Sequence, residues 1–408
     1  MVCACKTAQS INAQNPQQQR FLEDSILQTA DKYFENFIAN KDSFHLQIIY
    51  TKIDRDKNNR PAFTDYTFNT SSKNYFYPAS TVKMPVAFLA LQKINELKKP
   101  ELFDAAMITE TGKTATTGTY NDPKTNNGKP SIKNYIEQIF LVSDNNAFNR
   151  LYEFLGQEYI NKSLAAKGYN NAAIRHRLSV VLNEDQNRST NAVSFYKDSI
   201  KIFEQPAQYS KYNFNAAKIS LGKGYYTNGK LVNKPFDFSL KNKIELEQLH
   251  TIFKSVVFPS STSAKQKLNI TNEQREFLLK SMSMYPKQSG LGVYNNYHDA
   301  YVKFLLFGSD TATPPQHIKV FNKSGLAYGF LTDVAYIIDT KNNIEFMVSA
   351  TLLCNSDGIF NDDRYDYDKT GLPFFKRLGE ALYNYELKRS RKYAPVLGEF
   401  DFSTKSSD

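Results

Sequence analysis

Tryptophan is absent from this chain, and cysteine and histidine are scarce. Three cysteines and five histidines occur among 408 residues. Cys3 and Cys5 lie in the first few positions and Cys354 ends an apolar pattern, so the sequence predicts no disulfide framework. The histidines show no H-x-H or H-E-x-x-H spacing, and we therefore expect neither a metal site nor a cofactor. No apolar run reaches the roughly eighteen residues of a transmembrane helix.

Charge of one sign is not concentrated anywhere along the chain. The 51 basic and 41 acidic residues leave a formal net charge of +10, but no long block of lysine and arginine occurs. Lysines mixed with asparagine, tyrosine and acidic residues are typical of a solvated surface, so we expect no nucleic-acid partner. With 41% hydrophobic residues the chain can bury a large core, either in one large two-part domain or in two domains.

Three short motifs with chemical meaning follow one another in the chain. Their order is Ser80-Thr81-Val82-Lys83, Ser143-Asp144-Asn145 and Lys323-Ser324-Gly325. Each is weak evidence by itself, because a short motif means little outside its structural context. Together they supply the parts of a serine acyl-transfer site: a nucleophile with a lysine one helical turn away, a second serine to pass a proton, and a cationic strand to hold a carboxylate.

Three further matches are set aside because of their surroundings. Residues 220–223 also read S-x-x-K, but the glycines within and after this stretch are poor helix residues. Lys369-Thr370-Gly371 precedes apolar residues at helical spacing, so it predicts a helix entrance rather than a strand. Residues 224–231 are one residue short of a phosphate-binding loop, because Leu231 replaces the hydroxyl that binds magnesium.

The local pattern around each motif indicates what its residues can do. Ser80 opens a predicted helix, and Lys83 lies one turn further on the same face, where it can serve as the base that the hydroxyl needs. The helix N-terminus adds partial positive charge for an oxyanion. For each motif alone the simpler interpretation is structural: a capping residue at Ser80, Ser143 or Asn145, and a solvated lysine at Lys323.

Hydrophobic periodicity predicts a sheet whose strands come from both ends of the chain, with a mostly helical middle. No internal repeat is found. The predicted strands are 45–53, 63–68, 318–321, 332–338 and 346–351, and the predicted helices are 21–38, 82–97, 132–142, 147–155, 244–258, 272–284 and about 372–387.

The motifs, their order and their setting resemble those of the penicillin-recognising serine enzymes, and most closely the class A β-lactamases. The resemblance covers about residues 20 to 390. It implies an α+β fold of the β-lactamase/transpeptidase type, in which an antiparallel sheet flanked by helices is joined to a mostly helical part. We expect a flexible segment at 1–18, one domain at 19–395 (sheet 19–77 and 305–390, helical part 78–304, polar insertion about 192–242) and a tail at 396–408.

The resemblance also implies roles for the second motif. Ser143 relays the proton to the leaving amine. Asn145 hydrogen-bonds the substrate amide and Lys83. Asp144 faces inward and braces the loop.

The third motif is implied to bind substrate and to stabilise charge. Lys323 and Ser324 bind the substrate carboxylate, and Gly325 lets the substrate backbone lie against the strand. The backbone N–H groups of Ser80 and Leu326 form the oxyanion hole.

One departure from the family pattern concerns removal of the acyl group. Class A enzymes carry R-x-E-x-x-L-N, whose glutamate activates the deacylating water. The best match here runs from Arg177 to Asn183, with Ser179 in place of the glutamate. Asn183 matches the water-positioning residue, and Glu184 is an alternative base. We expect acylation through Lys83 and slow hydrolysis of the acyl-enzyme.

The expected activity is that of a serine hydrolase acylated on Ser80 by β-lactams or by D-alanyl peptides. A low-molecular-weight D-alanyl-D-alanine peptidase and a non-catalytic ligand-binding protein of the same fold remain alternatives. The expected partner is a small-molecule β-lactam or a peptidoglycan peptide, and the expected form is a monomer.

The chemistry points to the cell envelope, either periplasmic or lipid-anchored. Val2-Cys3-Ala4-Cys5 resembles the end of a bacterial lipoprotein signal, with Cys5 lipidated and residues 1–18 as a tether. The apolar segment of about 7 to 15 residues that such a signal needs does not precede it. A plain disordered tail is therefore the alternative.

Overall fold

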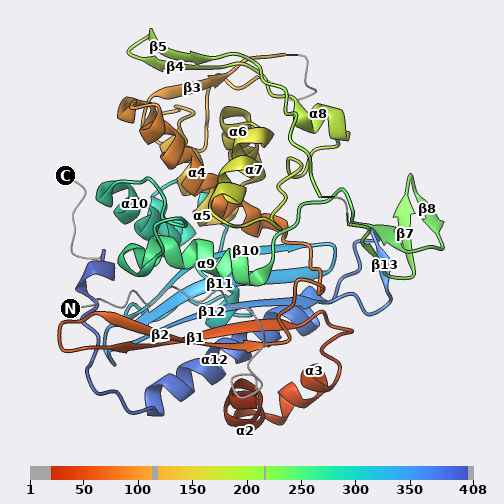
Figure 1. The fold of residues 1–408 in the computed structure, drawn as a ribbon, viewed down its shortest axis with the longest axis vertical. Helices are drawn as coiled ribbons and strands as arrows, with labels where there is room; N and C mark the ends of the chain where they lie inside the picture. The colour runs from red at the N-terminus through yellow and green to blue at the C-terminus, as the bar shows by residue number, and fades with distance from the viewer. Residues whose placement is uncertain (1–19, 113–117, 216, 403–408) are drawn as a thin grey trace, which may run out of the picture.

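Five strands from both ends of the chain form one antiparallel sheet in the computed structural model (Figure 1). The structure describes residues 20–112, 118–215 and 217–402, so the predicted tether with Cys3 and Cys5 lies outside the described residues. In spatial order the strands are β10 (Ile318–Ala327), β11 (Phe330–Asp339), β12 (Ile344–Leu353), β1 (Gln47–Arg55) and β2 (Pro61–Phe68).

Helices cover both faces of this sheet. On one face lies α12 (Leu372–Lys388), together with N-terminal turns that include α3 (Glu35–Ala39). The helical part of the chain covers the other face. Because both faces are covered, every residue of β11 is buried, and β10 and β12 are buried along most of their length. This arrangement confirms the predicted α+β fold with an antiparallel sheet between helices.

The helical part is built around α4 (Lys83–Glu96). Its residues from Lys83 to Ile94 are all buried, as is typical of a helix that is enclosed on every side. No helix among the described residues is both long and apolar enough to cross a membrane. The surrounding helices are α5 (Ile132–Val142), α6 (Asn145–Leu155), α7 (Gln157–Ala166), α9 (Leu246–Val257) and α10 (Asn272–Ser283).

The predicted helix over residues 21–38 is interrupted at Asp31. This residue is extended, with φ −167°, and its carboxylate accepts a hydrogen bond from the N–H of Tyr33 at 3.0 Å. The same carboxylate pairs with Arg377 on α12 at 2.5 Å. A capping aspartate that is also bound to another element ends one helix and starts the next, which a periodicity of apolar residues does not show.

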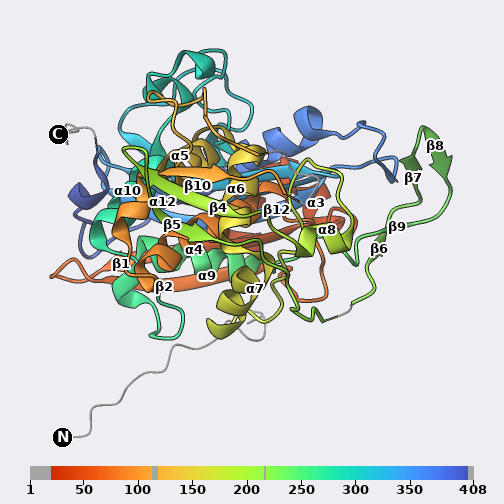
Figure 2. The same cartoon turned by 90° about the horizontal axis from the view of Figure 1, so that it is seen from above.

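The predicted insertion consists of two different parts. Strand β4 (Val193–Lys197) pairs with β3 (Ala106–Thr109) on one side and with β5 (Ile200–Gln205) on the other, and Val193 and Phe195 are fully buried. This first part belongs to the helical core rather than to the surface. Beyond it an arm projects from the molecule and ends in the hairpin of β7 (Gly224–Thr227) and β8 (Lys230–Val232) (Figure 2).

The motif matches that were set aside have no catalytic setting. Ser220 lies in the short strand β6 (Ser220–Leu221), and residues 224–231 form the hairpin of the arm. Lys369 lies in a helical turn, Tyr367–Gly371, that leads into α12, as its sequence predicted.

The described part of the predicted tail, residues 396–402, packs against the body of the protein. Phe400 is 0% exposed, and its ring centroid lies 4.9 Å from that of Tyr336 on β11. Leu397 is buried in the same core. The apolar side chains of this segment have no regular period, so their burial depends on the sheet they meet.

Candidate active site

Ser80 lies in a tight turn that leads directly into α4. The turn is a 3-10 helix, Ala79–Val82, and Ala79 has a left-handed backbone with φ 47°. The carbonyl oxygen of Pro78 accepts hydrogen bonds from the Thr81 hydroxyl at 2.6 Å and from its N–H at 3.0 Å. A strained residue held by such bonds is typical of a functional site. In this turn Ser80 is half-buried and lies at the start of a helix.

Lys83 is the first residue of α4 and is 0% exposed. Its ammonium group donates hydrogen bonds to the Ser143 carbonyl oxygen and, at 3.2 Å, to Ser143 Oγ. Burial lowers the pKa of Lys83 well below its usual value, and the nearby charge of Lys323 lowers it further. A lysine that loses its proton easily can take the proton of a serine hydroxyl.

Ser143 and Asp144 form the whole junction between α5 and α6. Ser143 is left-handed, with φ 57°, and its N–H bonds the Gln138 carbonyl. Asp144 caps α6 by accepting the N–H of Ala147 at 2.9 Å, and it pairs with Lys124 at 2.5 Å. The predicted bracing by Asp144 therefore takes the form of a helix cap.

Lys323 approaches the same hydroxyl from the sheet. It lies on β10, the edge strand beside the turn of Ser80, and its ammonium group donates to Ser143 Oγ at 2.8 Å and to the Ser324 carbonyl at 2.6 Å. Burial lowers the pKa of Lys323 to about 7, against the opposing effect of Asp333. Because Ser143 Oγ accepts from two lysines, its own O–H remains to be donated to a third group.

A buried polar network that the sequence did not reveal lies near Lys323, and the charges of its members Asp333 and Lys303 act on the pKa of Lys323. Asn322 donates to the Asp333 carboxylate at 2.8 Å, and Lys303 donates to the Asn322 side-chain oxygen at 2.9 Å. Burial lowers the pKa of Lys303 to about 7 and raises that of Asp333 to about 6. Polar residues at inward positions of apolar strands were the available signal.

Gly325 has a different role from the one expected. A Cβ atom on Gly325 would lie 2.7 Å from the Ser80 backbone nitrogen and 2.8 Å from that of Thr81. The space is therefore filled by the turn that carries the nucleophile, and not by substrate backbone. The glycine allows β10 and this turn to come into contact.

Ser324 is less accessible than the sequence analysis assumed. Alternation along β10 places Ser324 on the face opposite to Lys323 and Gly325, and Ser324 and Lys323 are each 2% exposed. A contact of either side chain with a substrate carboxylate stays a prediction and requires a movement that exposes it.

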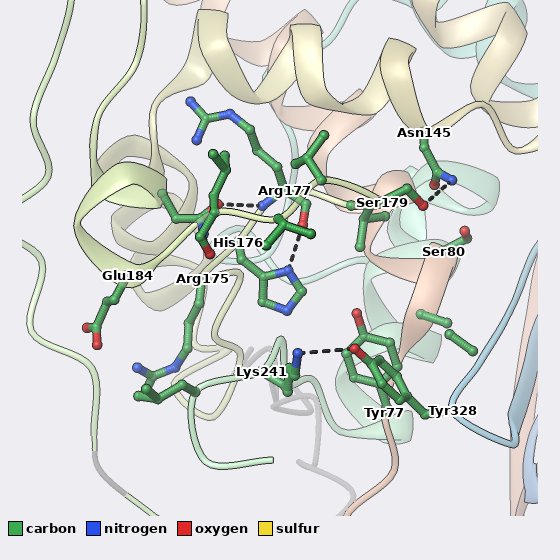
Figure 3. Close-up of a pocket in the computed structure, with 18 of the residues that line it drawn as sticks. Tyr77, Ser80, Asn145, Arg175, His176, Arg177, Ser179, Glu184, Lys241 and Tyr328 are labelled. Carbon is green, nitrogen blue, oxygen red and sulfur yellow. Dashed lines mark hydrogen bonds between the residues drawn. The ribbon is translucent and has the colours of Figure 1, made fainter. Parts of the chain in front are cut away.

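A cavity of about 750 Å³ opens beside Ser80 (Figure 3). Four of the predicted site residues line it: Ser80, Asn145, Asn183 and Leu326. Lys83, Ser143 and Lys323 do not line it. The buried lysine cluster therefore contributes no surface to this cavity.

The loop from Arg177 to Asn183 forms one wall of this cavity and is anchored at its base. Arg177 pairs with Glu153 on α6 at 2.8 Å, and both side chains are almost fully buried. Leu178 exchanges two backbone hydrogen bonds of 2.9 Å with the side chain of Asn149. These contacts fix the position of the next residue, Ser179.

Ser179, which the sequence pattern matches to the family glutamate, faces Asn145. Its backbone is left-handed, with φ 54°, and its hydroxyl accepts a hydrogen bond from Asn145 Nδ2 at 2.8 Å. Within the described residues Asn145 makes no hydrogen bond to Lys83, whose ammonium group bonds Ser143 instead. The expected Asn145–Lys83 contact is therefore replaced by Asn145–Ser179.

The structure does not bring an alternative base to Ser80. Glu184 is the one carboxylate among the described residues that line the cavity. It is bound to Arg188 at 3.1 Å and lies at the end of the cavity opposite Ser80 (Figure 3).

Asn183 caps the short helix α8 (Glu184–Arg188), where its side-chain oxygen accepts the N–H of Gln186 at 2.8 Å. Its predicted role in positioning water stays a prediction.

His176 is also unsuited to act as a base. Its Nδ1 bonds the Arg177 carbonyl oxygen at 2.7 Å, and its Nε2 accepts the N–H of Asn242 at 3.2 Å. Burial lowers its pKa to about 4, so the ring is neutral near pH 7 with both nitrogens occupied.

No group of three His, Cys, Asp or Glu side chains in the described ranges could hold a metal ion.

Comparison with protein-family models identifies the family. The model of the beta-lactamase enzyme family matches residues 30–385. The chain belongs to this family. A comparison with curated protein sequences finds no match.

Solved structures with similar folds include two β-lactamases and PBP-A. The β-lactamase from Burkholderia phymatum is 13% identical, covers 88% of this chain and 98% of its own, and has a TM-score of 0.49. The β-lactamase from Xanthomonas campestris pv. campestris is 14% identical, with 86% and 94% coverage and a TM-score of 0.47. PBP-A is 12% identical, with 91% and 96% coverage and a TM-score of 0.49.

The contact at Gly325 gives a stability prediction. Gly325→Ala pushes a methyl group into the backbone of the Ser80 turn, so we expect the free energy of unfolding to fall by about 1–3 kcal/mol. Gly292→Ala is the matched control, because nothing lies within 4 Å of its Cβ position. Denaturant unfolding of both variants measures the difference, and equal stabilities would contradict the proposed contact.

Proposed function

We propose that this protein is a serine hydrolase that is acylated on Ser80 by β-lactams or by D-alanyl peptides and that loses the acyl group slowly. The observation that carries the proposal is the pair of buried lysines bound to Ser143 Oγ beside Ser80. Such substrates belong to the cell envelope, which is therefore the location that we propose.

In the proposed acylation, the protons move through the lysine cluster. Neutral Lys83 takes the proton of Ser80 as its oxygen attacks the substrate carbonyl. As the C–N bond breaks, Ser143 gives its own proton to the leaving nitrogen and regains one from an ammonium group that it contacts. The lowered pKa values of Lys83 and Lys323 support this transfer near neutral pH.

The negative charge of the tetrahedral intermediate is proposed to meet the backbone N–H groups of Ser80 and Leu326. Strand β10 is an edge strand, so alternate N–H groups point away from β11. The close approach at Gly325 sets the Ser80 turn beside this edge. Two backbone donors that face one point are the usual means of binding an oxyanion.

Hydrolysis of the acyl-enzyme lacks an obvious base. Ser179 replaces the glutamate, and a serine hydroxyl does not accept a proton from water near neutral pH. This observation favours the second candidate function, a D-alanyl-D-alanine peptidase that retains a penicillin acyl group for a long time.

Intact-mass measurement tests the nucleophile. With excess penicillin we expect one added acyl group, which Ser80→Ala abolishes and Ser220→Ala does not. Lys83→Ala and Ser143→Ala are each expected to slow acylation at least about 100-fold, because proton-transfer groups typically contribute factors of 10² to 10⁴. An unchanged mass of the wild-type protein, or an adduct on another serine, would contradict the proposal.

The pH dependence of acylation tests the base. The rate is expected to rise with pH as Lys83 loses its proton, with a midpoint well below the usual lysine pKa. Lys323 lowers the pKa of Lys83, so Lys323→Gln removes that effect and is expected to move the midpoint to higher pH. Exposed Lys369 provides the control variant Lys369→Gln. A midpoint that stays in place in both variants would rule out coupling between the two lysines.

Ser179→Glu tests the missing deacylation base. The wild-type protein is expected to hydrolyse a chromogenic cephalosporin with a burst of about one equivalent followed by slow turnover. Ser179→Glu is expected to raise the steady-state rate, because a carboxylate beside Asn145 can deprotonate water, whereas Ser179→Gln, of the same size, is not. Fast wild-type turnover without a burst would contradict this expectation, and Glu184→Gln would then identify the base.

A further inference from the structure

Two positive side chains on the cavity wall form no ion pair among the described residues, although the charge of Glu184 acts on one of them, Arg175. Arg175 and Lys241 both line the cavity, and no ion pair to either is found among the described residues. The other charged residues of the wall are neutralised: Arg177 pairs with Glu153, and Glu184 pairs with Arg188. The cavity therefore carries an excess of two positive charges.

Both side chains are held in place but keep unused donors. The guanidinium of Arg175 lies 4.2 Å from the ring centroid of Phe214 and makes one bond, of 3.5 Å, to the Asn215 carbonyl. Lys241 donates to the Tyr328 hydroxyl at 3.1 Å. A guanidinium has five N–H donors and an ammonium group has three, so both groups can still bind an anion.

The rest of this wall is apolar or neutral. His176 carries no charge near pH 7, as its lowered pKa shows, and its ring is parallel to that of Tyr77 at 6.3 Å. Phe214 and Leu240 line the same region. Figure 3 shows Ser80 and Asn145 at one end of the cavity, Arg175 at the other, and Lys241 between them beside Tyr77 and Tyr328. This lining, apolar along its length with positive groups at Lys241 and Arg175, suits an apolar group that ends in an anion.

The position of Ser143 decides which half of the substrate enters this cavity. The leaving amine must meet Ser143, which gives it a proton, and Ser143 does not line the cavity. The acyl half is then left for the cavity, whose lining includes Asn145 and the loop around Ser179. This step rests on the proposed function.

We propose that Arg175 and Lys241 form a subsite for a carboxylate on the acyl half of the substrate. The preferred acyl donor is then an acidic peptide, or a β-lactam with an acidic acyl chain, rather than a neutral one. Lys241 comes from the end of the inserted segment, so the insertion takes part in substrate selection.

Matched penicillins test the subsite. The pair is made by coupling 6-aminopenicillanic acid to glutaric acid or to its uncharged monoamide, and the measurement is the second-order rate of acylation. We expect the carboxylate to acylate wild-type protein about tenfold faster than the amide, and this preference to weaken as salt is added. The double variant Arg175→Gln/Lys241→Gln is expected to bring the ratio of the two rates to about one.

Two controls separate charge from folding. Lys230→Gln removes one positive charge from the exposed hairpin of the arm and is expected to keep the wild-type ratio. Arg175→Lys keeps the positive charge and is expected to keep most of the preference for the carboxylate compound. This variant tests the charge even where the double variant folds poorly.

Two failures are distinguishable. No acylation by either compound contradicts the proposed function. Acylation by both at equal rates, also with the succinic and adipic homologues, overturns the subsite and leaves the proposed function standing.

Discussion

The site depends on one oxygen atom that receives hydrogen bonds from two buried lysines. Ser143 Oγ lies 3.2 Å from the ammonium nitrogen of Lys83 and 2.8 Å from that of Lys323. Two buried positive charges this close repel each other, and burial alone already disfavours both. Burial therefore lowers the pKa values of both lysines, so that either ammonium group loses its proton more readily than an exposed lysine does. The packing that buries α4 is therefore also what lowers the pKa of Lys83.

The sequence identified this cluster because each part lies in a local pattern. Ser80 and Lys83 are one helical turn apart, Ser143 separates two helical periods, and Lys323 follows the apolar strand pattern of residues 318–321, so the family order was enough to connect them. The same local patterns placed most strands and helices of the two main layers. Boundaries moved where a polar side chain competed with the helix, as at Asp31.

What the sequence did not show depends on contacts between distant segments. Nothing near Gly325 indicates that the backbone of Ser80 fills its missing side chain. Nothing near Asn145 indicates that it binds Ser179 rather than Lys83. Phe400 lies in a short 3-10 turn whose sequence has no hydrophobic period, and its burial follows from the aromatic rings of the sheet that it meets. Polar composition likewise indicated a surface insertion, although Lys241 at its end faces the cavity.

The loop that carries Ser179 is anchored at its base, although Ser179 stands where the class A sequence pattern has a glutamate. Its anchor is the buried pair of Arg177 and Glu153, and a buried ion pair is costly to form unless its hydrogen bonds are satisfied. Arg177 meets this requirement with a further bond to the Ser189 carbonyl at 2.7 Å. The structure that this anchor supports is the cavity wall from Leu178 to Asn183. On the proposed function, the loop therefore serves to hold the acyl group rather than to hydrolyse it, and slow deacylation and acyl-side selection follow from the same arrangement.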